Sequence, residues 1–243
     1  KHMSQRALHS ILKARKEKKF SSFIDFYYRT HLDRRILENL IRVGALDNLE
    51  RNRKYLLWLL FVLRRRPRQG GQLALELKDK QKELFAPFSL AERIQAELEL
   101  LGFELSGHPL QLWQKSLKEL GVIQSADLSQ LPEGALVRVA GIKVVQHTPP
   151  TRSGQRVIFL TLEDAQGLID MAVFESVQKD YARTIFEGWL LFMEGRIAKR
   201  GKASLVVSRA WNLLEMAEEE LSLPKGERIS PSLAQRWYHG GWR

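Results

Sequence analysis

The sequence predicts a multidomain α + β protein, in which an N-terminal helix–hairpin–helix module and a helical connector precede a five-stranded OB-fold β-barrel. Apolar residues recur with the helical period over residues 4–66, and the period changes to two from Ala135 onward. Positive charge is concentrated in the same two regions. The predicted segments are a helical module at 4–68, an acidic helical connector at 69–133, the barrel at 134–214 and a tail at 215–243.

The N-terminal module is expected to contain four helices. Helical periodicity starts close to the N-terminus, and Ser21-Ser22 offers a cap for the second helix. The third helix ends at Gly44, because glycine readily leaves the helical conformation. Asn48 or Asn52 can cap the fourth, which runs through Leu63.

The connector is predicted to be helical and acidic. Its clearest helix covers Leu90 to Leu101 and stops at Gly102. A turn follows at Ser106 to Pro109, and Leu112 to Leu120 form a further short helix. Residues 121–133 are expected to be a linker.

The barrel prediction depends on alternating apolar residues after Ala135. A helical interval, Glu175 to Phe186, separates the third candidate strand from the fourth. Five strands with one helix in that place is the order of an OB-fold, an architecture that typically binds nucleic acids or oligosaccharides. The candidate strands cover residues 135–146, 156–164, 168–174, 189–197 and 203–212.

Composition excludes several classes of protein. A chain of 243 residues with 44% hydrophobic residues can bury one large or two small cores, so it is not disordered throughout. The absence of cysteine excludes a disulfide framework, a thiolate zinc site and a cysteine nucleophile. No apolar run is long enough to span a membrane, so we expect a cytoplasmic protein with no membrane partner.

The net charge of +11 is unevenly distributed. Residues 1–68 have a net charge of +12 and residues 134–214 of +4, whereas residues 69–133 carry −4 and residues 215–243 carry −1. Charge that served only solubility would not segregate in this way. Two basic modules joined by an acidic connector indicate a polyanionic partner, and DNA is the expected one.

The hairpin at Gly44 is the candidate site for duplex DNA. A glycine turn between two helices lets the backbone N–H groups of the next helix approach a phosphate without a Cβ clash. Basic side chains in the first turn of that helix would add charge-assisted contacts. The alternative is an ordinary helix-ending glycine in a bundle. The candidate duplex-binding residues are Gly44, Arg51, Asn52, Arg53 and Lys54.

The candidate site for single-stranded DNA is the barrel groove, which two basic loops border. Ile158, Leu160 and Leu162 share one face of the second strand, so Phe159 faces the other way and could stack on a base. The alternatives are an aromatic residue packed under a loop and a solvated basic hairpin tip. The candidate cations are Arg138, Lys143, Arg152, Arg156, Lys199, Arg200 and Lys202.

No catalytic, metal or cofactor site is expected in this chain. The six histidines never pair at metal-ligand spacing, and neither an HExxH nor a phosphate-loop pattern occurs. Polymerase or nuclease chemistry requires several carboxylates gathered around metal ions, and no such constellation is visible.

Two glutamine-led apolar peptides follow the break at Gly70-Gly71. Short segments of this kind can insert apolar side chains into a groove of a partner protein. A linker laid on the helical bundle is the favoured alternative. The candidate partner-binding residues are Gln72, Leu73, Leu75, Gln81, Leu84 and Phe85.

Two segments are specific enough to suggest a family: LGFELSGHPL at 101–110 and FLTLEDAQGLIDMAVFE at 159–175. Together with the helical module and the barrel, over most of residues 11–212, they resemble the C-terminal part of the bacterial DNA polymerase III alpha subunit. That protein is the C-family replicative polymerase, a DNA-directed DNA polymerase.

The resemblance implies a tandem helix–hairpin–helix region on duplex DNA, a connector with the sliding-clamp motif, and an OB domain near single-stranded template. The family's first glycine hairpin, its catalytic palm carboxylates and its PHP domain have no counterpart in this chain. By position the clamp peptide is Gln72 to Glu76, which lacks the expected aromatic end. Gln81 to Phe85 supplies a phenylalanine at a shifted place.

We therefore expect a non-catalytic, DNA-binding portion of such an alpha subunit, acting on duplex and single-stranded DNA during DNA replication. The alternatives are an interaction module that docks the sliding clamp or other replisome subunits, and a free-standing polymerase-like accessory protein. An OB-containing ligase or tRNA synthetase ranks last, because no nucleotide-binding signature is present. Lys1-His2-Met3 resembles a cloning remnant, so the natural protein either extends further or begins near Ser4.

Overall fold

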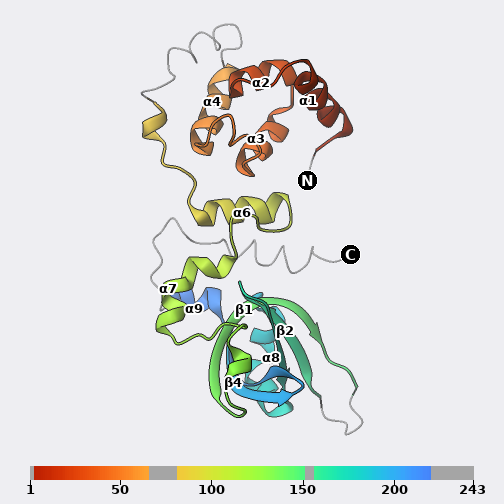
Figure 1. Ribbon diagram of the computed structural model, residues 1–243, viewed down its shortest axis with the longest axis vertical. Helices are drawn as coiled ribbons and strands as arrows, with labels where there is room; N and C mark the ends of the chain where they lie inside the picture. Colours follow the sequence, from red (N-terminus) through yellow and green to blue (C-terminus); the bar gives the residue numbers. More distant parts are fainter. Residues whose placement is uncertain (1–2, 66–80, 151–155, 220–243) are drawn as a thin grey trace. The chain divides into compact units, whose positions relative to one another are not determined.

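The computed structural model describes residues 3–65, 81–150 and 156–219, which fall into two compact units (Figure 1). The first unit is residues 1–106 and the second is residues 107–243. The boundary lies inside the predicted connector. The described residues of the predicted connector are therefore divided between the two units.

Four helices form the N-terminal part of the first unit, as the sequence predicts. Ser22 Oγ accepts a hydrogen bond from Asp25 N at 3.2 Å and caps the second helix. Asn52 Oδ1 accepts from Tyr55 N at 3.1 Å, so Asn52 caps the fourth helix. The elements of this unit are α1 (Gln5–Glu17), α2 (Phe23–Thr30), α3 (Arg34–Arg42), α4 (Arg53–Arg65), the 3-10 turn η1 (Lys82–Leu84) and α6 (Leu90–Leu100).

The apolar faces of α2, α3 and α4 meet in one core. The longest apolar run of the sequence, residues 55–63, lies within α4, and its buried members are Tyr55, Leu56, Leu59, Leu60 and Leu63. In the part of the chain that the structure describes, no helix is long and apolar enough to cross a membrane. The most deeply buried core residues are Leu37, Ile41, Leu56, Leu60 and Leu63.

Helix α6 begins and ends where the sequence predicts. Ser89 Oγ accepts from Glu92 N at 3.2 Å, and Glu92 Oε2 accepts from Ser89 N at 2.8 Å, which is a complete capping box. The helix stops before Gly102, whose φ is +90°. Glu97 of α6 is 1% exposed and accepts hydrogen bonds from the backbone N and the Oγ of Ser106. This buried carboxylate holds the turn that follows the helix.

The second unit is a closed five-stranded barrel with short helical segments (Figure 1). Its strand order is β1-β2-β3-β5-β4; β3 and β5 are parallel, and the other neighbours are antiparallel. The predicted OB-fold is confirmed. The elements are η2 (Pro109–Trp113), α7 (Gln114–Glu119), η3 (Leu128–Gln130), β1 (Leu136–His147), β2 (Ile158–Glu163), β3 (Leu168–Val173), α8 (Glu175–Glu187), β4 (Leu190–Arg200), β5 (Lys202–Asn212) and α9 (Leu213–Glu219).

Strand β1 closes the barrel because it pairs with two neighbours in succession. It pairs with β4 through residues 136–142 and with β2 through residues 142–147. A Cβ on Gly141 would lie 2.8 Å from Glu163 O, so glycine permits the close approach at the change of partner. All five strands contribute side chains to the core. These include Val139, Leu162, Ile169, Met193 and Leu205.

The segment that precedes the barrel is packed against it. Val122 forms a parallel bridge with Arg138 of β1. Asp164, in the turn between β2 and β3, accepts hydrogen bonds from Ser125 N and Ser125 Oγ, both at 2.7 Å. The prediction of a linker over 121–133 is therefore wrong, because this polar segment finds a carboxylate partner on the barrel.

Candidate nucleic-acid interface

The Gly44 hairpin is built as the sequence predicts, with a left-handed glycine between two helices. Gly44 has φ +79°, and Ala45 N donates to Leu40 O at 3.0 Å, which ends α3. Asp47 N then donates to Gly44 O at 3.1 Å and tightens the turn. This geometry places the side chain of Asp47 beside the start of α4.

Arg53 locks this hairpin from inside. Its Nε and Nη2 donate to the two carboxylate oxygens of Asp47 at 3.0 and 2.7 Å, and its Nη1 donates to Arg42 O at 3.0 Å. A Cβ on Gly44 would lie 2.0 Å from Nη2. Arg53 is 7% exposed. The structure therefore gives Arg53 a role within the fold, which disfavours the predicted contact with duplex phosphate.

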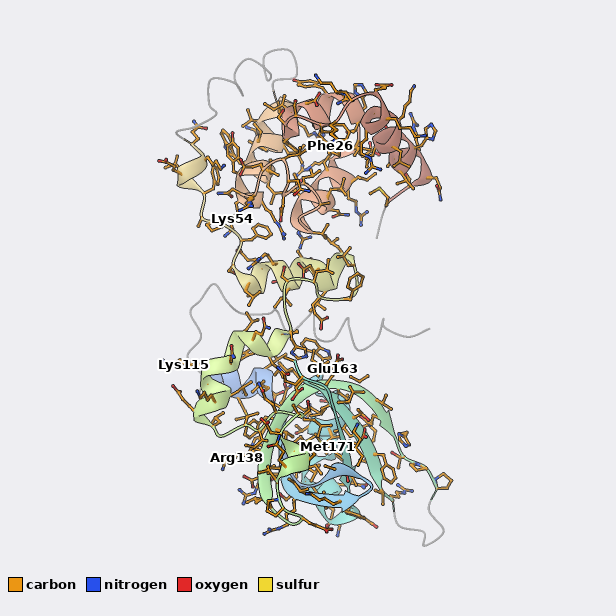
Figure 2. All side chains as sticks on the ribbon, in the orientation of Figure 1. Phe26, Lys54, Lys115, Arg138, Glu163 and Met171 are labelled. Atoms are coloured by element: carbon orange, nitrogen blue, oxygen red, sulfur yellow. The ribbon has the colours of Figure 1, made fainter. Side chains whose placement is uncertain are left out.

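The other predicted duplex contacts differ in their availability. Asn52 is occupied as the cap of α4, and its Nδ2 also donates to Phe85 O at 2.6 Å. Lys54, labelled in Figure 2, pairs with Glu92 at 2.9 Å. Burial opposes the charge on Glu92, yet Lys54 and the Ser89 N–H together hold the pKa of Glu92 below its ordinary value. Arg51 is exposed and forms no hydrogen bond or ion pair with any described residue.

On the barrel, the predicted stacking residue is on the surface. Ile158, Leu160 and Leu162 are buried, whereas Phe159 is 38% exposed. Its ring stacks on His147, with centroids 5.4 Å apart and an interplanar angle of 20°. The sequence did not identify His147, because only the register, which pairs His147 with Phe159, brings the two rings together.

Four predicted cations lie around the barrel surface with different partners. Arg138, labelled in Figure 2, pairs with Glu194 at 3.0 Å and is half-exposed. Lys199 donates to Ser129 O at 3.1 Å, and Lys202 lies 3.6 Å from Asp170, with the Lys202 and Asp170 side chains both more than half exposed. The Arg156 side chain is exposed and has no partner among the described residues. Arg152 and the Arg200 side chain lie outside the described parts.

The side chain of Lys143 is buried and does not lie on the barrel surface. It is 7% exposed, and its Nζ donates to Ile185 O at 2.6 Å and Phe186 O at 2.8 Å, which are carbonyls of the last turn of α8. Burial lowers the pKa of Lys143 to about 8. The structure therefore gives Lys143 a structural role, which disfavours its predicted contact with single-stranded DNA.

The second glutamine-led peptide is packed on its own unit. The Phe85 ring lies 5.6 Å from that of Trp58 and 6.1 Å from that of Tyr55, and the side chain is half-buried. This packing disfavours the predicted insertion of Phe85 into a partner's groove. Leu84 remains 79% exposed, and Gln81 is half-buried. The first peptide, with Gln72, Leu73 and Leu75, lies outside the described residues.

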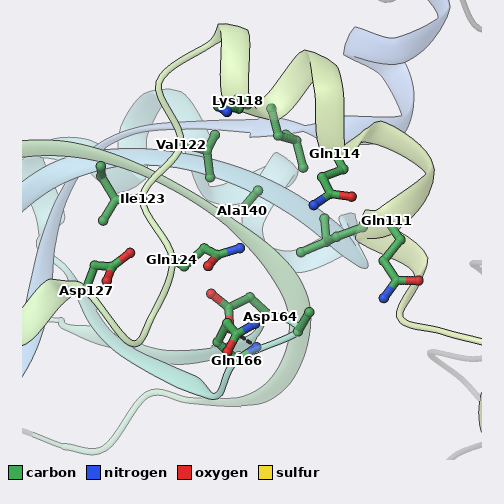
Figure 3. Close-up of a pocket in the computed structure, with 13 residues that line it drawn as sticks. Gln111, Gln114, Lys118, Val122, Ile123, Gln124, Asp127, Ala140, Asp164 and Gln166 are labelled. Carbon is green, nitrogen blue, oxygen red and sulfur yellow. Dashed lines mark hydrogen bonds between the residues drawn. The ribbon is translucent and has the colours of Figure 1, made fainter.

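A cavity of about 390 Å³ lies between the 110–127 segment and the barrel (Figure 3). Its apolar lining includes Leu117 and Ala140, and Lys118 is the one basic residue that lines it. Asp127 and Asp164 also line the cavity, so the net charge of the lining is negative and does not favour a phosphate backbone. The structure also shows no candidate metal site: within residues 3–65, 81–150 and 156–219, no group of three or more His, Asp or Glu side chains could hold a metal ion. Four glutamines surround the cavity: Gln111, Gln114, Gln124 and Gln166.

Comparison with known proteins gives the same two parts. Residues 1–56 match the helix-hairpin-helix motif, and residues 137–213 match the OB-fold nucleic acid binding domain. The error-prone DNA polymerase of Symbiobacterium thermophilum is 36% identical over 236 residues, covering 86% of this chain and 22% of that polymerase. The error-prone DNA polymerases of Alkalilimnicola ehrlichii and Brucella melitensis are 31% and 28% identical, covering 85% and 86% of this chain and 20% of each relative.

A helix-hairpin-helix motif joined to an OB-fold domain defines a DNA-binding, polymerase-associated protein segment. More particularly, the chain is a homologue of the error-prone DNA polymerases and spans about a fifth of the length of the curated relatives that it matches. The resemblance to the bacterial C-family polymerases is thereby confirmed.

Proposed function

We propose that this chain is a non-catalytic, DNA-binding part of an error-prone, C-family type of DNA polymerase, and that its barrel holds single-stranded template. The observation that carries the proposal is the stacked pair of Phe159 and His147 on the outer face of β1 and β2. Aromatic residues on this face of an OB-fold can stack on bases without sequence preference. Both residues are exposed, so a base can stack against the pair.

The charges next to this aromatic pair support the same function. Arg156 leads directly into β2, and Lys199 and Lys202 flank the turn between β4 and β5. The Arg156 side chain has no partner among the described residues, and Lys199 and Lys202 each make one exposed contact, which a phosphate can replace at little cost. Cations that neutralise phosphates make binding strongly dependent on salt.

For the helical unit we propose contact with duplex phosphates. The support is the match of residues 1–56 to a helix-hairpin-helix motif and the net charge of +12 on residues 1–68. In the hairpin itself, Arg51 keeps a guanidinium group that no described residue engages. Backbone contacts of this kind position a protein on DNA and carry no sequence information.

The test of the barrel site is fluorescence anisotropy of a labelled single-stranded oligonucleotide with the whole chain. Phe159→Ala should weaken binding by roughly 5- to 150-fold, because one stacked base contributes about 1–3 kcal/mol. Phe186→Ala is the matched control, since Phe186 is similarly exposed at the end of α8. Equal losses for both variants, or no loss for Phe159→Ala, would overturn the site.

Charge reversal separates this function from protein docking. Lys199→Glu with Lys202→Glu should weaken binding of single-stranded DNA. It should also reduce the slope of log affinity against log salt by about 1 for each phosphate that the variant no longer neutralises. Unchanged affinity and slope would instead favour an OB barrel that docks another protein.

A further inference from the structure

A groove between α3 and α4 collects arginine side chains that the sequence analysis did not connect. It has a volume of about 690 Å³ and lies within the first unit. Arg34 and Arg42 reach it from α3, and Arg64 and Arg65 reach it from the last turn of α4. These residues are up to 31 positions apart in sequence, so only the packing of the two helices brings them together.

The charge of this arginine groove is not balanced within the protein. Glu38 pairs with Arg34 at 2.5 Å, and Glu99 pairs with Arg42. Arg64 and Arg65 form no ion pair with any residue that the structure describes, and both are exposed. Four guanidinium groups therefore face two carboxylates, which leaves two positive charges for an anionic ligand.

Asn39 carries a donor that no described residue satisfies, and it lines both this groove and an apolar hollow beside Leu40 and Leu100. This residue lines the groove, and its Nδ2 is buried without a hydrogen-bond partner in the described parts of the chain. A buried donor left without an acceptor destabilises the protein that contains it. This donor has no exposed surface, so a phosphate oxygen attracted by the surrounding arginines would accept the bond only after the covering side chains move.

Phe61 shapes the edge of the groove. Its side chain is 49% exposed, and the guanidinium carbon of Arg65 lies 4.5 Å from its ring centre. This cation–π contact orients the Arg65 side chain without neutralising its charge. The guanidinium is therefore held at the surface with its N–H donors available.

We propose that the arginine groove of α3 and α4 binds the phosphodiester backbone of DNA and is the main phosphate-binding surface of the helical unit. This inference rests on the proposed function of the helical unit. It places the phosphate contact in the groove and not at the hairpin, because the side chains of Arg53 and Asn52 form hydrogen bonds within the fold. Cations in the last turn of a helix also offset the helix dipole, and this alone would explain Arg64 and Arg65. The helix dipole of α4 explains neither the position of Arg34 and Arg42 on α3 nor the unpaired donor of Asn39.

The test compares two double variants of the whole chain by anisotropy with a labelled DNA duplex. Arg64→Glu with Arg65→Glu should weaken duplex binding at least 10-fold and reduce the salt slope by about 2. The matched control is Arg15→Glu with Lys16→Glu, which makes the same charge change in the last turn of α1. The control should remain within threefold of the wild type.

Asn39→Ala distinguishes a binding role from a structural one. Removal of the unpaired donor should leave the midpoint of thermal unfolding unchanged or raised, while duplex affinity falls severalfold. Equal losses in the two double variants, or full affinity in both Arg64→Glu/Arg65→Glu and Asn39→Ala, would overturn the groove. If Arg64→Glu with Arg65→Glu does not fold, Arg64→Gln with Arg65→Gln replaces it. A wild-type chain that binds no duplex would instead refute the proposed function of the helical unit, whatever the variants do.

Discussion

The guanidinium group of Arg53 occupies the space that a side chain at Gly44 would fill. Nη2 of Arg53 is 2.0 Å from the Cβ position of Gly44, and it is held there by the carboxylate of Asp47. The glycine of this hairpin is thus required by the fold of the chain itself. A glycine turn before a basic helix start is therefore no direct evidence of phosphate contact.

Gly44→Ala should destabilise the helical unit by about 2–4 kcal/mol, since it combines a positive φ with a clash against Arg53. Gly102→Ala is the control, because Gly102 has φ +90° and no atom within 4 Å of its Cβ position. The control should lose only about 1 kcal/mol. Urea denaturation followed by circular dichroism measures both. Equal losses would mean that the Arg53 contact contributes nothing.

Arg53→Lys should lower the stability of the helical unit by about 1–3 kcal/mol, because an ammonium group cannot make the paired contact with Asp47. At temperatures where the variant is folded, its affinity for duplex DNA should remain within twofold of the wild type. Anisotropy and thermal denaturation on the same samples separate the two effects. A large fall in affinity at unchanged stability would instead indicate that Arg53 contacts DNA.

Asp164→Asn should loosen the segment that precedes the barrel. The carboxylate accepts from Ser125 N, Ser125 Oγ, Gln166 N and Gly167 N at 2.7–2.8 Å, and an amide would turn its own N–H donors toward these groups. We expect a loss of about 2–4 kcal/mol and faster proteolysis within residues 121–133. Asp127→Asn, at an exposed position, should change neither quantity. Unchanged proteolysis in Asp164→Asn would contradict this role.

Lys143→Met should change how stability depends on pH. Burial lowers the pKa of Lys143 to about 8 from 10.5, so the unfolded chain binds more protons than the folded one between these values. This residue therefore makes the free energy of unfolding rise with pH in that window. Lys143→Met should remove that contribution, whereas Lys179→Met, exposed on α8, should keep it. Thermal unfolding from pH 7 to pH 10.5 measures the difference, and identical profiles for all three proteins would show that the pKa of Lys143 is ordinary.

The secondary structure of this chain could be predicted well because its signals are local. The caps Ser22 and Asn52, the helix stops at Gly44 and Gly102, and the alternation around Phe159 each depend on a few neighbouring residues. The site residues were harder to predict. A cation's role depends on its partner, and the partners of Lys143 are the carbonyls of residues 185 and 186, more than 40 positions away.

By itself, the sequence determined the helical and barrel parts, the order of their elements along the chain and the basic character of both, because periodicity and charge are properties of short stretches. Only the tertiary structure decided which cations are available to a ligand. It buried Arg53 and Lys143, stacked His147 on Phe159, and gathered the arginines of α3 and α4 into one groove. The physical reason is that a side chain's availability depends on hydrogen-bond and charge partners that are distant in sequence, and these become neighbours only when the chain packs.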